Sequence, residues 1–89
     1  MAHHVYRGIN QDLGEVYHGV STQPRRRIDG SHCEGGTIAL AHWDCENHAV
    51  QWRVVSTHRS QEMASRVAHD HELSYRHRNG YRNLRTGGI

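Results

Sequence analysis

The chain has 89 residues, a hydrophobic fraction of 35% and a formal net charge of +2 at pH 7, with ten histidines counted as neutral. This length predicts a single domain over residues 1–89 with a small core, and the hydrophobic fraction is above that of a disordered chain. The sequence lacks a run of 18 apolar residues and an apolar N-terminal segment, which argues against a membrane partner and a secretory signal.

All eleven basic residues are arginines, and they are unevenly distributed. Three follow one another at 25–27, and four lie in the acid-free segment 75–89, whereas residues 28–52 contain four acids and no arginine. A guanidinium fork can hold a phosphate through two parallel hydrogen bonds. This separation of charge favours a polyanionic partner.

The first third of the chain predicts a β-hairpin followed by a short helix. Two alternating segments, at 4–9 and 15–20, flank a turn at 10–14. The run from Ser21 to Pro24 has the composition of a helix start, so we expect a short helix from Arg25 to about Asp29 that Gly30 ends.

The rest of the chain predicts one further strand and up to two helices. Residues 38–43 fit either a helix capped by Thr37 or a strand, and residues 50–55 form the clearest strand. A long helix begins after Ser60 and runs to Asn79-Gly80. Its expected apolar stripe consists of Met63, Ala64, Val67, Ala68, His71 and Tyr75. The expected fold class is α/β (α+β), with a small three-stranded antiparallel sheet flanked by helices.

Over nearly its whole length the chain resembles the GIY-YIG nuclease domain family. His4-Val5-Tyr6 corresponds to the Gly-Ile-Tyr motif at the end of the first strand of the family. Tyr17-His18-Gly19 corresponds to the Tyr-Ile-Gly motif of its second strand. The two tyrosines are 11 positions apart, a usual separation in that family, and Arg27 follows ten residues after the second. The ending Asn79-Gly80-Tyr81-Arg82-Asn83 resembles the Gly-Tyr-Asn close of the family.

This resemblance implies a metal-dependent endonuclease that hydrolyses phosphodiester bonds. Tyr6 and Tyr17 would orient and activate water, Arg27 would bind the scissile phosphate, and His32 would assist proton transfer. Glu72, with Asp70 as the alternative, would hold Mg²⁺ or Mn²⁺. Asn83 would support the site.

The chemistry of phosphodiester hydrolysis is compatible with these residue types. One carboxylate plus waters is enough to hold Mg²⁺, which keeps most of its hydration shell. An arginine can stabilise the charge that develops on the phosphoryl oxygens, and a tyrosine or histidine can move a proton. The expected partner is DNA, with RNA left open because phosphate contacts do not identify the sugar.

Four residues are expected to bind nucleic acid: Arg25, Arg26, Arg82 and Asn83. A domain this small has little surface for sequence readout, so we expect either weak specificity or specificity supplied by an attached module or a protein partner. Two cysteines are too few for a disulfide framework and could form one bridge or none, which favours a reducing compartment. Without a predicted signal peptide or membrane span, the expected location is cytoplasmic.

Two other functions remain open from the sequence. One is a non-catalytic nucleic-acid-binding module on the same fold. The other is a zinc-stabilised interaction domain, since cysteines and histidines gather within 17 positions, although the spacing lacks a Cys-x₂-Cys knuckle. The candidate zinc ligands are His32, Cys33, His42, Cys45 and His48.

Overall fold

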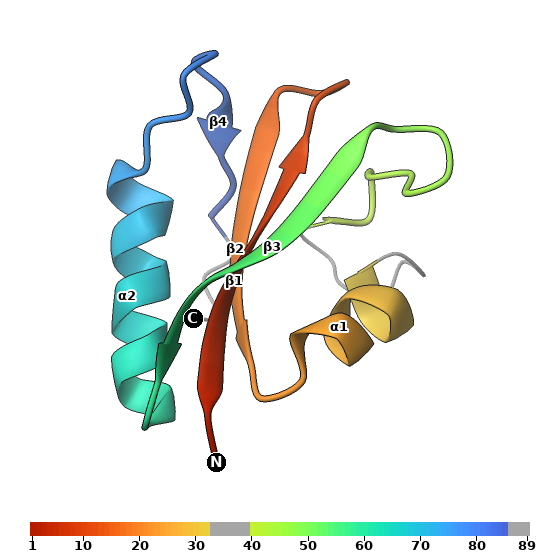
Figure 1. The fold of residues 1–89 in the computed structure, drawn as a ribbon. Helices are drawn as coiled ribbons and strands as arrows, with labels where there is room; N and C mark the ends of the chain where they lie inside the picture. The colour runs from red at the N-terminus through yellow and green to blue at the C-terminus, as the bar shows by residue number, and fades with distance from the viewer. Residues whose placement is uncertain (33–39, 86–89) are drawn as a thin grey trace.

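The structure, a computed structural model, describes residues 1–32 and 40–85, except for the side chains of residues 31 and 32. It is an α+β domain in which two helices accompany one sheet (Figure 1). The elements in chain order are β1 (His3–Asn10), β2 (Glu15–Ser21), α1 (Pro24–Arg27), the π-helical turn η1 (Ile28–His32), β3 (Val50–His58), α2 (Gln61–Ser74) and β4 (Arg82–Asn83).

The sheet is mixed and has the strand order β3-β1-β2-β4. β1 lies between β3 and β2 and is antiparallel to both, whereas β4 is parallel to β2. The expectation of a three-stranded antiparallel sheet is therefore corrected to four strands of mixed direction. β4 has only two residues and depends on backbone hydrogen bonds to residues distant in sequence, such as Arg82 N to Gly14 O at 2.9 Å. No local sequence pattern therefore predicts this strand.

The predicted hairpin is confirmed. Asn10 ends β1, and its buried side-chain oxygen accepts hydrogen bonds from the backbone N–H groups of Asp12 and Leu13. Gly14 closes the turn with φ of 66°, a left-handed conformation that glycine adopts without a steric penalty. The turn fixes the register, which places Tyr6 opposite Gly19.

The two helices begin where the sequence predicts them and end elsewhere. Pro24 starts α1, but the chain continues as a π-helical turn to His32, so Gly30 does not end it. The Ser60 side chain caps α2 by accepting from Met63 N at 3.2 Å. α2 ends at Ser74 instead of Asn79-Gly80, because Tyr75 adopts extended backbone geometry.

The segment before β3 is described only from residue 40. Residues 38 and 39 of the expected helix lie outside the described residues, and residues 40–43 form one turn closed by Trp43 N and Leu40 O at 2.9 Å. Those four residues therefore do not form the expected helix or strand. The strand expected at 50–55 is confirmed and extends to His58.

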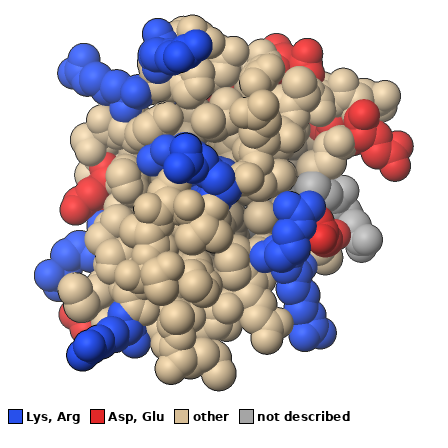
Figure 2. Space-filling view, viewed as in Figure 1, with Lys and Arg blue, Asp and Glu red and all other residues tan. Residues whose placement is uncertain are grey.

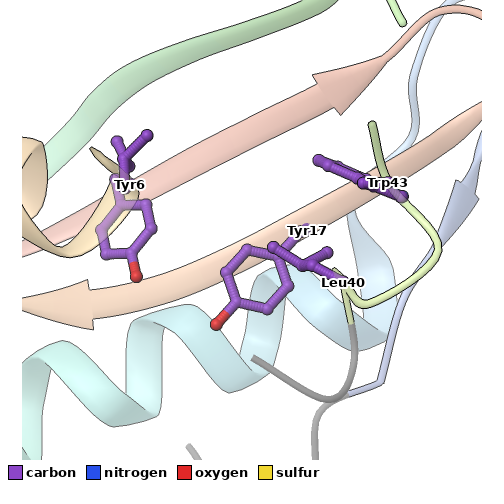
Figure 3. Packing of buried hydrophobic residues seen from close by; sticks show 5 residues of the cluster. Tyr6, Tyr17, Leu40 and Trp43 are labelled. Carbon is purple, nitrogen blue, oxygen red and sulfur yellow. The ribbon is translucent and has the colours of Figure 1, made fainter. Parts of the chain in front are cut away.

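The sheet has two different faces, since successive residues of a strand point to opposite sides. On the helix face, defined by Val5, Ala64 and Ala68, α2 packs against β1 in an all-aliphatic cluster. The phenol face carries a mostly aromatic cluster (Figure 3) of Tyr6, Tyr17, Ile28, Leu40 and Trp43. The expected stripe of α2 is wrong at Met63, which is 55% exposed; its buried positions are Ala64, Ala68 and Glu72.

Two further observations bear on location. No helix within the described ranges is long and apolar enough to cross a bilayer. Cys45 is disulfide-bonded, a state that is typical of oxidising compartments. The cytoplasmic location stays a prediction, and the disulfide weighs against it.

Candidate active site

Each tyrosine of the hairpin stands opposite a glycine, and this pairing makes room for the aromatic rings. Tyr6 pairs with Gly19, and Tyr17 pairs with Gly8. A Cβ atom added at Gly19 would lie 2.5 Å from the Tyr6 hydroxyl, closer than real contacts allow. The Tyr6 ring therefore lies directly over the Gly19 backbone, and a ring of Trp52 covers Gly8 in the same way.

The two phenols are close neighbours, with ring centroids 6.2 Å apart. Their side chains come from adjacent strands, and both hydroxyls point to the same side of the sheet (Figure 3). The hydroxyl of Tyr6 is hydrogen-bonded to Tyr17 and to Arg27. A guanidinium only donates, so the Tyr6 oxygen accepts from Arg27 and its proton is directed to Tyr17.

Burial is the main influence on both phenols and raises their pKa values above the ordinary value of 10. For Tyr6, the Tyr17 neighbour raises the pKa further, and Arg27 opposes this. For Tyr17, the hydrogen bond from Tyr6 and the charge of Arg27 act against burial. Both phenols are therefore protonated at neutral pH.

Arg27 joins this buried pair from a solvent-exposed position at the end of α1. It lines an open pocket together with Arg26 and polar groups of the segment that leads into α1. An exposed guanidinium that contacts a buried phenol can bind an anion on its open side. The remaining lining residues are Ser21, Thr22, Gln23 and Gly30.

The structure places Glu72, and not Asp70, beside the phenols. Glu72 is 4% exposed, and its charge is near enough to raise the pKa of Tyr17. Asp70 is exposed on α2. Within the described chain, β4 pairs with Glu15 and Val16 of β2 and does not extend to Tyr17. His69 Nδ1 lies 3.7 Å from a Glu72 oxygen.

Asn83 lies next to Glu72 in a second open pocket that also includes Arg82 and Arg85. Its Nδ2 donates to the carbonyls of His71 at 3.3 Å and Tyr75 at 2.7 Å. Its Oδ1 is buried and has no hydrogen-bond partner among the residues described. The side chain thus joins β4 to the C-terminal end of α2.

The residues expected to bind nucleic acid differ in their surroundings. Arg25 forms an exposed ion pair with Asp29 at 3.1 Å, and Arg82 forms one with the buried Glu15 at 2.5 Å. Figure 2 shows basic side chains at several separate places, one group of them near the middle of the view with no acidic side chain against it. The arginines in this view thus do not form one continuous patch.

A buried carboxylate network that the sequence analysis missed supports this end of the sheet. Glu15 accepts from Trp43 Nε1 at 2.9 Å and contacts His42 Nε2 at 2.6 Å, in addition to Arg82. Burial raises the pKa of Glu15, but these three hydrogen bonds together outweigh it and lower the pKa. The partners are 27, 28 and 67 positions away, so no local motif indicates them.

The zinc hypothesis fits the structure poorly. Cys45 is disulfide-bonded and therefore offers no thiolate, and His42 contacts Glu15. His48 Nδ1 is within hydrogen-bond distance of Asn10, at 3.0 Å. Within residues 1–32 and 40–85, no group of three or more His, Cys, Asp or Glu side chains could hold a metal ion. Cys33 and the side chain of His32 lie outside the described residues.

The structure thus brings together four of the expected site residues, namely Tyr6, Tyr17, Arg27 and Glu72. They come from β1, β2, α1 and α2. Comparisons with models of protein families, with curated proteins and with solved structures found no match. Any assignment of function to this chain therefore depends on the geometry of this cluster.

Proposed function

We propose that the chain is a GIY-YIG-type endonuclease that hydrolyses phosphodiester bonds in DNA with the help of Mg²⁺ or Mn²⁺. The supporting observation is the meeting of two buried phenols, an exposed guanidinium and a buried carboxylate from four separate elements. Aromatic packing alone would need neither the charge of Arg27 nor that of Glu72 beside the hydroxyls.

In this proposal Arg27 binds the scissile phosphate and the phenols orient the reacting groups. The guanidinium donates to the Tyr6 oxygen on its protein side, and its exposed side can hold phosphoryl oxygens and stabilise their growing negative charge. The Tyr6 hydroxyl donates its proton in a hydrogen bond to Tyr17. The Tyr17 hydroxyl would orient the attacking water or a phosphate oxygen.

Glu72 is the residue that would hold the metal ion. A single buried carboxylate beside an open pocket fits Mg²⁺, which retains several waters and needs few protein ligands. When bound, the ion would supply charge neutralisation at the phosphate and an acidified water. The side chain of Asn83 lines the same pocket and would orient groups there.

The decisive experiment is a plasmid-nicking assay with Mg²⁺, Mn²⁺ or EDTA, comparing the native chain with Arg27→Ala. We expect metal-dependent nicking that falls by about 100-fold or more in the variant, because a charge-stabilising donor is lost. Arg66→Ala is the matched control, since Arg66 is an exposed arginine of α2 that pairs with Glu62 at 3.6 Å. It should retain activity within about twofold.

Two results would contradict the proposal. Nicking that persists in EDTA or is equal in both variants would exclude this site. Binding to DNA that weakens steeply with salt, without cleavage under any metal, would instead support a non-catalytic nucleic-acid-binding module. An RNA substrate of the same sequence, tested in parallel, identifies the preferred sugar.

A further inference from the structure

A row of cationic and imidazole side chains crosses the sheet on the face away from the phenols. Arg7 follows Tyr6 along β1, so the two side chains point to opposite faces. In the register of the sheet Arg7 is opposite Arg53 of β3 on one side and His18 of β2 on the other. Two like charges in directly opposite positions destabilise a sheet unless something neutralises them.

The guanidinium of Arg7 is held in place by uncharged partners. Its Nε donates to His18 Nε2 at 2.9 Å, and its Cζ lies 3.8 Å from the centroid of the Tyr75 ring. His18 is fully buried and stacks on His71, with ring centroids 5.0 Å apart. The side chain of Arg7 is thus ordered before any ligand arrives, which reduces the entropic cost of binding.

No protein carboxylate balances these two arginines in the part of the chain that the structure describes. The ion pairs there involve Arg25, Arg66 and Arg82, and histidines 42 and 69. Burial lowers the pKa of Arg7, and the charge of Arg53 lowers it further. An anion between the two guanidinium groups would remove this repulsion.

We propose that Arg7 and Arg53 form a second anion site, which binds a backbone phosphate of a polynucleotide on the helix face. A phosphodiester offers two unbridged oxygens, which two guanidinium forks can share. His18 accepts at Nε2, so its proton is on Nδ1, a buried atom with no partner among the described residues. His18 therefore holds Arg7 in place and, because its Nδ1 is buried, does not itself contact the anion.

The polynucleotide is favoured over an isolated anion by the other charges of the chain. Arg26 and Arg27 line an open pocket beside the phenols, so positive charge is available near both faces of the sheet. A polyanion can engage both sites at once and gain affinity from their linkage. The inference does not require that the phenol face cleaves DNA, because it concerns binding alone.

The test measures anisotropy of a fluorescein-labelled single-stranded oligonucleotide in EDTA, which prevents metal-dependent cleavage. Arg27→Ala is the background, so that the contribution of the first site is reduced. We expect Arg53→Gln in this background to weaken binding by about 3–10-fold and to reduce the slope of log K against log salt by about one. Arg59→Gln is the control, since it removes one exposed arginine just beyond β3. It should change the affinity by less than about 1.5-fold.

A second arm uses inorganic phosphate as the probe. The Nε–H resonances of Arg7 and Arg53 should shift on titration, and the Arg7 shift should be reduced in Arg53→Gln at an unchanged melting temperature. Equal weakening of oligonucleotide binding by Arg53→Gln and Arg59→Gln would overturn the proposal, because it would indicate only general attraction. Phosphate shifts without any effect of Arg53→Gln on the oligonucleotide would overturn the polynucleotide as the ligand.

Discussion

Val5 and Tyr6 are consecutive residues of β1, but their side chains have different surroundings because they point to opposite faces of the sheet. Val5 is fully buried against Ala64 and Ala68, and this cluster contains no polar atom from a side chain. Tyr6 is equally buried, but its hydroxyl belongs to a chain of polar groups that ends at an exposed arginine. The comparison teaches that one strand can supply apolar packing on the helix face and a polar hydrogen-bonded group on the phenol face.

The carboxylate beside the phenols offers the sharpest test of this division. In Glu72→Gln we expect nicking to fall by about 100-fold or more, since the charge that would hold the ion is removed while the shape of the side chain is kept. Asp70→Asn removes one charge from the same helix at an exposed position and should stay within about twofold. Equal losses in the two variants, measured as initial nicking rates, would show that Glu72 has no special role.

Gly19 tests whether the glycines opposite the tyrosines position the phenol face. Gly19→Ala places a methyl group where the Tyr6 hydroxyl lies, so we expect a loss of about 10–100-fold in nicking and about 1–3 kcal/mol in the free energy of unfolding. An alanine at Gly30 meets no atom within 4 Å and should leave the free energy of unfolding unchanged. Urea unfolding and nicking of both variants distinguish strain at this position from a general effect of alanine.

Substitutions on the helix face should change the free energy of unfolding and leave the nicking rate unchanged. Val5→Ala removes two methyl groups from a fully buried position, and we expect a loss of about 2–3 kcal/mol in the free energy of unfolding. Val54→Ala, at a side chain that is 47% exposed, should lose less than about 0.5 kcal/mol. Under conditions where Val5→Ala is folded, its nicking rate should equal that of the native chain. A reduced rate would mean that the two faces are not independent.

His18 makes the helix face sensitive to pH. Burial is the main cause that lowers its pKa to about 3 from 6.5, and the charge of Arg7 adds to it. The unfolded chain therefore binds the proton first, so this contribution to stability is complete above pH 6.5 and is lost as the pH falls towards 3.

The urea midpoint should report this titration. Between pH 7 and pH 5 we expect a loss of about 1–2 kcal/mol, most of which is absent in His18→Gln, where position 18 cannot titrate. Burial also lowers the pKa of His71, so the variant keeps a smaller loss in this range. The pKa of Glu15 is lowered from 4.5, so its titration affects the free energy of unfolding mainly below pH 5. It therefore contributes little to the change between pH 7 and pH 5. An identical pH dependence in the variant would assign the effect to another histidine.

The sequence predicted the parts of the fold that depend on neighbouring residues. The hairpin, the strand at 50–55 and the Ser60 cap all depend on alternation, turn residues or a hydroxyl at a helix start. β4 was missed because a two-residue strand exists only through its bonds to β2. The early end of α2 at Ser74 reflects the extended backbone of Tyr75, whose ring lies under Arg7.

The functional roles of the candidate residues stay predictions, but the sequence indicated which of them meet. Tyr6, Tyr17 and Arg27 were expected together from the family resemblance, and the structure brings their polar groups together. The choice between Glu72 and Asp70 required the rotation of α2 about its axis, which helical periodicity gives only approximately. The Glu15 network could not be expected, because its members are brought together by the fold alone.

The turn between β1 and β2 has an evolutionary consequence. A change in its length that moved the pairing by a single position would turn the whole side-chain set of one strand to the other side of the sheet, and Tyr6 would no longer face Gly19. Descendants of this chain can therefore accept insertions in this loop only if the new loop restores the same strand alignment. Asn10 and Gly14 are constrained as well, because the turn depends on the Asn10 side chain and on the left-handed backbone of Gly14.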